Sequence, residues 1–398
     1  MTPSASGSRA RQILKSGVVL AGLLIFNHYL EHRGFFEPYT IASYDWMQRL
    51  VRQAKPAVTE PLVTIFTLGP DVHGQEIEVT IARMIQIIAC GEPAVIGVDW
   101  RTGNWNPQTL SELQTGPASR VPIVWARETN AVGKPGTVAA EVALPSHWST
   151  GIAAVPEDWD HSIRRHQRWF APDRESFSWV IAKTYCRVPG VKAPGCPRID
   201  RCAEEHCEAE GLLDFTNGSD TVDWFPAEVP LALSSRSPTG CSALPESGHS
   251  QSIKGRVVLI GDGSSADMHS SPLGRKLGVQ IMGHAVQSDL FGASLQTTNG
   301  WLLFLLHLLS IIFVLQVNRL PSFVALAVNL LGLPFICVVL SFLAYRSAYH
   351  WFNFAPLIGG VIIHQLWEQA ELNQALGKKV KHLESRECVA RHGDGSQR

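Results

Sequence analysis

The stretch VVLIGDGSSADMHSSPLG, from Val257 to Gly274, decides how the rest of the chain is interpreted. Its first four residues form an apolar, mostly β-branched run, which is typical of a buried strand. The run then enters a turn that holds two glycines, two serines and two aspartates. Such a turn can cradle a phosphate, hold another ligand, or form a corner of the fold.

The turn does not match the common phosphate-binding motifs. A Walker A loop needs a lysine after its last glycine, and here a serine follows Gly263. A dinucleotide fingerprint would place its third glycine where Ala266 stands and would open a helix, but the residues that follow are turn-like. We therefore expect no cofactor. A metal site built from Asp262, Asp267 and His269 is the alternative.

Apolar runs and segments of helical periodicity alternate over the central part of the chain. The helical segments carry apolar residues three or four positions apart. This alternation predicts an α/β domain with a largely parallel or mixed sheet that helices cover. The expected strands are Leu62–Leu68, Ala94–Val98, Val121–Trp125, Gly211–Phe215 and Arg256–Ile260, and the expected helices are Glu76–Ala89, Ser176–Thr184 and Val279–Leu290.

Charged residues near strand ends supply candidate ligand-binding positions. Asp99 directly follows an expected strand, and open α/β sheets bind ligands at the carboxyl ends of their strands; a turn or helix cap is its alternative role. The basic cluster His161–Arg168 can bind an anion or form a solvated face. No GxSxG or HExxH arrangement occurs, so we expect no enzyme and no catalytic residue. The candidate ligand-binding residues are Asp99, Arg101, Arg164, Arg165, Asp262 and Asp267.

The apolar residues gather towards both ends of the chain, which indicates a membrane protein. Charged residues make up 17% of the sequence, below the roughly 25% of soluble domains. A membrane helix needs about 17–25 apolar residues. We predict four transmembrane helices, over residues 13–30, 300–318, 321–345 and 351–367. The alternatives are a cleaved signal peptide for the first and the buried bundle of a soluble protein for the other three.

Basic residues predict the orientation, because the cytoplasmic flanks of membrane helices are rich in Lys and Arg. Two arginines precede the first predicted span, and three lysines follow the last. We therefore expect residues 1–12 and 368–398 in the cytoplasm and residues 31–299 outside the cytoplasmic membrane. The net charge of −1 creates no field for a nucleic acid, so we expect no such partner.

Six of the eight cysteines lie in residues 31–299. In an oxidising compartment, clustered cysteines indicate disulfides. A zinc site that includes His206 is the alternative, although the spacing lacks CxxC pairs. Cys90 directly follows an expected helix, and we expect a buried free thiol there. The disulfide candidates are Cys186, Cys196, Cys202, Cys207 and Cys241.

The motifs between about residues 35 and 295 resemble, in order, those of the second CHASE family of bacterial extracytoplasmic sensory domains. SYDWMQRL (43–50) is similar to the opening helix of the family. EPAVIGVDW (92–100) is similar to its A-x-V-I-G-x-D strand, and DWDHSIRR (158–165) to its D-x-D-G-x-x-R hairpin. The stretch that begins IKGRVVLIGDGSS resembles its closing block, which makes the glycine-rich turn a structural corner. The irregular insert Arg187–Cys207 departs from the family pattern.

The segment after the last predicted span resembles the signalling helix that follows such domains. Apolar residues within Gln365–Glu387 recur at a spacing that permits a short coiled coil and hence a homodimer. They are Leu366, Leu372, Leu376, Val380 and Leu383. No output domain is expected after this helix.

The resemblance implies a membrane-anchored sensor of the bacterial inner membrane with a periplasmic main domain. Such a protein binds an unknown extracytoplasmic ligand and signals through its membrane helices to a separate cytoplasmic protein. The alternative is a membrane scaffold that senses nothing and recruits a cytoplasmic effector.

Overall fold

The structure, a computed structural model, divides into two compact units. Residues Asp45–Gln296 form the α/β domain, and Met1–Tyr44 with Thr297–Arg398 form the helical unit. The division falls within helix α2 (Glu37–Ala54). The structure describes residues 18, 22, 25, 29, 33, 37–54, 62–68, 75–100, 105–127, 148–171, 174–205, 209–213, 215, 223–226, 253–292, 296–297, 300–317, 319–320, 322–348, 350–352 and 354–393.

The described strands of the α/β domain include a six-stranded sheet in the order β4-β3-β2-β10-β1-β9. Every neighbouring pair in this sheet is parallel, so the predicted α/β class and parallel sheet are confirmed. The strands are β1 (Val63–Leu68), β2 (Val95–Val98), β3 (Ile123–Arg127), β4 (Ser149–Ile152), β9 (Asp223–Pro226) and β10 (Val257–Asp262).

Strand β10 lies inside this sheet, between β1 and β2. Its side chains alternate between two apolar cores: Val257 and Leu259 belong to one, and Val258 and Ile260 belong to the other. All four are fully buried, and each burial contributes about 1.5–3 kcal/mol. This two-sided burial explains why the run is apolar at every position rather than at alternate ones.

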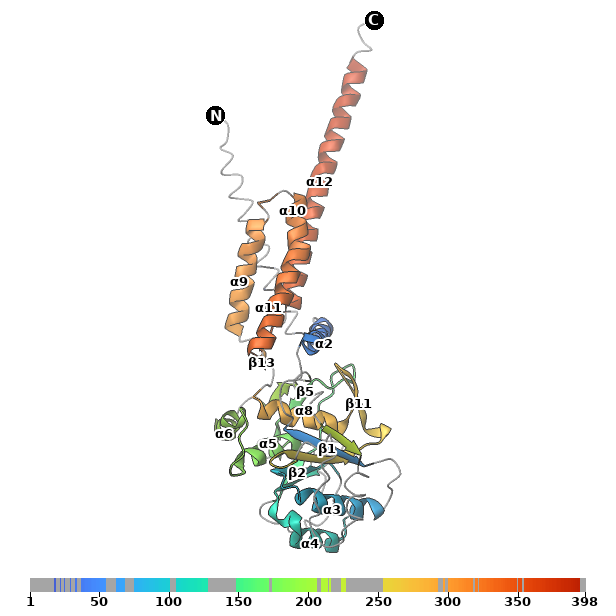
Figure 1. The fold of residues 1–398 in the computed structure, drawn as a ribbon. Coiled ribbons are helices and arrows are strands. Elements are labelled where there is room, and N and C mark those ends of the chain that lie inside the picture. Colours follow the sequence, from blue (N-terminus) through green and yellow to red (C-terminus); the bar gives the residue numbers. More distant parts are fainter. Residues whose placement is uncertain are drawn as a thin grey trace. The chain divides into compact units, whose positions relative to one another are not determined.

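Helices cover both faces of the sheet (Figure 1). On one face lie α3 (Gln75–Ala89) and α4 (Pro107–Thr115), whose apolar residues share a core with Val258 and Ile260. On the other face lie α5 (Phe177–Arg187) and α8 (Gly278–Leu290), which share a core with Val257 and Leu259.

Two parts of the chain differ from the expected elements. The run expected as strand Gly211–Phe215 forms β8 (Glu210–Leu212), which pairs antiparallel with β5 (Arg165–Gln167) outside the main sheet. The insert expected to be irregular contains helix α6 (Cys196–Glu205). That helix is stabilised by tertiary contact, because its residues Ile199 and Cys202 are buried in the core beside α5 and α8. The short strands β6 (Trp169–Ala171) and β7 (Arg174–Glu175) pair with each other.

The glycine-rich turn after β10 leads into a hairpin rather than into a helix. A short 3-10 helix, η2 (Ser265–Asp267), precedes the antiparallel strands β11 (Met268–Ser271) and β12 (Gly274–Leu277). Gly261 is required for packing, since a Cβ there would lie 2.5 Å from the Cβ of Val279 on α8. The stretch is therefore a corner that brings α8 against the sheet.

Gly261→Ala is expected to destabilise the α/β domain by about 1–3 kcal/mol, because the added methyl group overpacks the contact with α8. The measurement is urea denaturation of the purified chain in detergent, followed by tryptophan fluorescence. Ser265→Ala, at an exposed position of η2, is the control. Equal midpoints for both variants would contradict the close approach of α8.

The helical unit contains α9 (Gly300–Val317), α10 (Ser322–Ala327), a π-helical turn η3 (Val328–Gly332), α11 (Leu333–Ala348), the short strands β13 (Gln296–Thr297) and β14 (His350–Trp351), and α12 (Ala355–Gly393). Within it, Val314 of α9, Cys337 of α11 and Val361 of α12 belong to one apolar cluster. Residues of these three helices therefore pack together.

Among the described residues, one helical run is both long and apolar enough to cross a membrane, Phe323–Ser347 with 25 residues. It corresponds to the predicted span 321–345. The apolar helix Leu308–Val317 is shorter. The predicted span 351–367 begins in β14 and continues into α12, which starts at Ala355. Most of the predicted span 13–30 lies outside the described residues. The other three spans therefore stay predictions.

Candidate functional site

Two aspartates stand side by side at the carboxyl edge of the sheet. Asp99 directly follows β2, and its N–H donates to the carbonyl of Ile260 at 2.7 Å. Asp262 ends the neighbouring strand β10. After β2 the chain continues to α4 on one face, whereas after β10 it continues to α8 on the other. Adjacent strands that part in this way form a topological switch point, where open α/β sheets bind ligands.

Asp267 of η2 completes a cluster of three carboxylates, which we call the carboxylate edge (Asp99, Asp262 and Asp267). Burial, together with repulsion from Asp267 and Asp262, raises the pKa of Asp99 to about 7. Burial also raises the pKa of Asp267. The three predicted aspartates thus influence one another, and the site binds a proton or a positive charge more readily than isolated carboxylates do.

Asp267 connects the carboxylate edge to helix α8. Its Oδ2 accepts a hydrogen bond of 3.0 Å from the N–H of Gly278, the first residue of α8. A side chain at Gly278 would clash, because its Cβ would lie 2.7 Å from that oxygen. A carboxylate at a helix N-terminus also interacts favourably with the helix dipole. The charge of Asp267 therefore affects the strength of its interaction with the N-terminus of α8.

Asp262 is hydrogen-bonded to a residue two positions further along the chain, and His269 lies next to the carboxylate edge. Asp262 accepts from the N–H and the hydroxyl of Ser264 at 2.7 and 2.8 Å. The imidazole of His269 lies 3.6 Å from Asp267 and 3.3 Å from Glu157. No three His, Cys, Asp or Glu side chains of the described part of the chain are placed to hold a metal ion. The metal alternative for this turn thus finds no support among those residues.

Arg164 lies in a different place, at the centre of a buried ion-pair cluster. Its guanidinium donates to both oxygens of Asp45 at 2.8 Å, to both oxygens of Asp160 at 2.8 Å, and to Asp158 at 3.0 Å. The arginine is 4% exposed, and its hydrogen bonds lower the pKa of Asp160. Arg164 joins α2, through Asp45, to the segment 158–164.

The other predicted basic positions are divided between surface, core and undescribed chain. Arg165 is partly exposed and pairs with Asp158 at 3.6 Å, while Arg101 lies outside the described residues. His166 and Arg168 are buried, so the alternative of a solvated face is wrong for much of this cluster. Burial lowers the pKa of His166 to about 4. The guanidinium of Arg168 donates to Asp289 of α8 at 2.8 Å.

Three of the five predicted disulfide cysteines are oxidised, and the prediction for Cys90 was wrong. Cys186 and Cys196 are bonded, with their Cα atoms 5.3 Å apart, and Cys202 is also in a disulfide. These oxidised residues do not support the zinc alternative. Cys90 is disulfide-bonded rather than a free thiol, because its partner comes from tertiary structure that helical periodicity does not report. Cys207 and Cys241 lie outside the described residues.

A family model described as the CHASE2 domain matches residues 18–317. The chain therefore belongs to the CHASE2 family, whose members are extracytoplasmic sensor domains of membrane proteins. No match to the chain was found among curated proteins or among solved structures.

Asp99→Asn is expected to raise the free energy of unfolding at pH 8 by roughly 1–3 kcal/mol. The folded-state pKa of Asp99 is about 7 against an ordinary value of 3.8. Between these two pH values the folded protein therefore binds more protons than the unfolded protein does. The ionising carboxyl of Asp99 consequently lowers the stability of the wild type as pH rises through this range. The measurement is urea denaturation of both chains at pH 4 and pH 8.

The difference between the two chains should be small at pH 4, where the wild-type carboxyl is protonated, and larger at pH 8. Asp200→Asn, at an exposed position of α6, is the control and should change little. A difference for Asp99→Asn that is independent of pH would contradict the raised pKa.

Arg164→Leu is expected to cost about 3–5 kcal/mol of stability, because it leaves three carboxylates near the protein interior without their cation. Because the hydrogen bond from Arg164 lowers the pKa of Asp160, the stability from this ion pair is lost as pH falls through that pKa, and the difference between the two chains should shrink in acid. Denaturation midpoints of the full chain report this, with Arg165→Leu as the partly exposed control. An Arg164→Leu chain as stable as the control would show that the cluster is dispensable.

Proposed function

We propose that this protein is a multi-pass sensor of the bacterial inner membrane whose periplasmic domain responds at the carboxylate edge. The sensor signals through its helices to a separate cytoplasmic protein, and the chain itself catalyses no reaction. Membership of the CHASE2 family supports the sensor role. The observation that carries the proposal is the hydrogen bond from Gly278 of α8 to Asp267, because it couples the candidate site to a helix.

Charge at the edge gives the proposed mechanism a physical basis. A cationic ligand or a proton that neutralises one carboxylate reduces the repulsion felt by the other two. The interaction of Asp267 with the N-terminus of α8 then changes in strength. Helix α8 is the last long element of the α/β domain before α9 in sequence, so a shift of α8 is passed along the chain.

A second connection runs to α2 from the β11–β12 hairpin, which follows η2 in sequence. The turn between β11 and β12 holds Pro272, whose carbonyl accepts a hydrogen bond of 3.2 Å from Arg49 of α2. The Arg164 cluster joins the same helix to segment 158–164. Helix α2 follows the predicted span 13–30 in sequence, so the segment after this span is joined to the β11–β12 hairpin, whereas α8 is joined to Asp267 of the carboxylate edge. A ligand shifts such a system only by its differential affinity for two arrangements.

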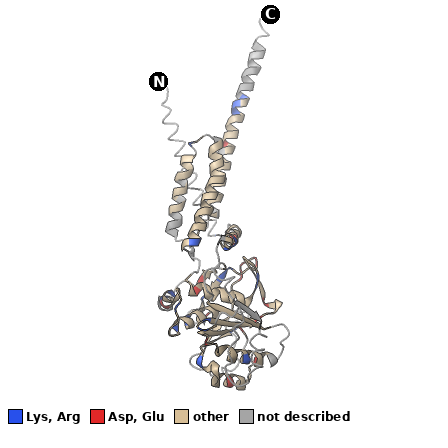
Figure 2. Cartoon of the chain, viewed as in Figure 1, with Lys and Arg blue, Asp and Glu red and all other residues tan. Residues whose placement is uncertain are grey.

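The long helix α12 is the proposed output. It continues for 39 residues, and Leu366, Leu372, Leu376 and Val380 are exposed along it. Lysines gather on one turn of it (Figure 2), at Lys378, Lys379 and Lys381. An exposed apolar stripe on a helix is the usual basis of coiled-coil pairing. We infer that this part of α12 is cytoplasmic and pairs with a second copy to present a surface to the signalling partner.

Single cysteines placed along residues 372–383, after replacement of Cys388, are expected to crosslink in membranes with maxima every three to four residues. Asp267→Asn should change the crosslinking efficiency at those maxima, because it alters the hold on α8, whereas Ser265→Ala should not. Quantified dimer bands on gels provide the measurement.

A periodic crosslinking pattern that is the same in the wild type and in Asp267→Asn would favour the scaffold function over the sensor function. A flat pattern would exclude pairing through this part of α12.

A further inference from the structure

The C-terminal end of α8 is held by one sharp corner of the chain. The N–H of Gly195 donates to the carbonyl of Leu290, the last residue of α8, at 2.6 Å. A side chain at Gly195 cannot be accommodated, because its Cβ would collide with the carbonyl oxygens of Asp289 and Leu290. The corner thus fits closely over the point where the chain leaves α8.

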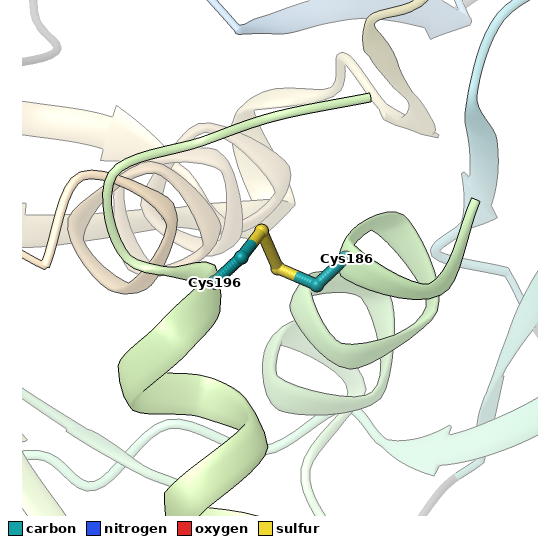
Figure 3. Close-up of a disulfide and its surroundings, with 2 residues drawn as sticks. All are labelled: Cys186 and Cys196. Atoms are coloured by element: carbon teal, nitrogen blue, oxygen red, sulfur yellow. A yellow bond between two sulfur atoms is a disulfide. The ribbon is translucent and has the colours of Figure 1, made fainter. Parts of the chain in front are cut away.

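The residue after this corner is Cys196, which is bonded to Cys186 near the end of α5. Figure 3 shows the bond joining the start of α6 to α5. Both cysteines are partly exposed, whereas Cys202, in another disulfide, is 3% exposed. An oxidised cysteine that solvent reaches is more open to thiol–disulfide exchange than a buried one.

A second contact holds the same end of α8 without help from the disulfide. Arg168 donates through Nε and Nη2 to Asp289 at 3.1 and 2.8 Å, and both residues are buried. Two contacts therefore hold the end of α8. One is the ion pair between Arg168 and Asp289, and the other is the hydrogen bond from Gly195, which lies next to the disulfide. Reduction of the disulfide weakens the hydrogen bond from Gly195 and leaves the ion pair of Arg168 in place.

We propose that Cys186–Cys196 is a site of thiol–disulfide exchange with an extracytoplasmic dithiol protein, and that its reduction loosens the corner from the end of α8. One thiolate of the dithiol attacks a sulfur of the bond and forms a mixed disulfide, and the second thiolate then displaces the protein thiol. Two electrons pass from the dithiol to the protein. The dithiol becomes a disulfide, and its two protons end on Cys186 and Cys196. The inference does not depend on the carboxylate edge being a ligand site.

The test is hydrogen–deuterium exchange of the full chain in detergent, with and without dithiothreitol as the dithiol. Alkylation and peptide mapping show which bonds are reduced. Amides of the peptides that contain Gly195 and residues 290–292 are expected to exchange on the order of ten- to a hundredfold faster after reduction. Those of β10 should keep their protection.

The double variant Cys186→Ser, Cys196→Ser should exchange fast at these peptides in both conditions, and Cys337→Ser, which removes a free cysteine, should behave as the wild type. Unchanged exchange in a wild type whose Cys186–Cys196 bond is reduced would overturn the proposal. So would loss of protection in β10 as well, which would make the bond purely structural. If the double variant fails to fold, the wild type is titrated with dithiothreitol instead. Exchange at the peptides around Gly195 and residues 290–292 should then rise with the fraction of reduced Cys186–Cys196 bond, and no such rise would overturn the proposal.

Discussion

The structure depends on the burial of β10 on both faces in the middle of a parallel sheet. A strand in that position has no solvent face, so each of its side chains must be apolar and each face must be covered. Helices α3 and α4 cover one face, and α5 and α8 cover the other. The neighbouring strand β2 sends the chain to the first face and β10 sends it to the second. The switch point between them is a direct consequence of this burial.

That constraint explains where the charged groups are. Asp99 and Asp262 end neighbouring strands, so they are forced together at an edge that helices partly enclose. Burial, together with repulsion from Asp267 and Asp262, raises the pKa of Asp99. In contrast, Arg164 places one buried guanidinium among three carboxylates and donates hydrogen bonds to all of them. Repulsion among the like-charged carboxylates at the edge favours the binding of a proton or a cation, whereas the carboxylates around Arg164 already have a cation beside them.

The same helix, α8, is held at both ends by chemistry that conditions outside a cell can change. Its first residue donates to Asp267, whose charge depends on protonation and on its neighbours. Its last residue accepts from a corner stapled by a disulfide. In the two proposals made above, each input alters a different contact of α8, so the helix combines both inputs. This combination suits an extracytoplasmic sensor family.

The sequence by itself determined the α/β class, the buried strands, the family and the oxidised state of most clustered cysteines, because these follow from local periodicity, motif order and composition. It also placed Asp99 directly after a strand, whereas Asp262, expected in the turn, is the last residue of β10. Tertiary structure alone decided that β10 lies between β1 and β2, that Arg164 is enclosed by Asp45, Asp158 and Asp160, and that Cys90 is paired. These facts depend on contacts between residues far apart in the chain, and no local pattern of side chains encodes which distant segment will supply the partner.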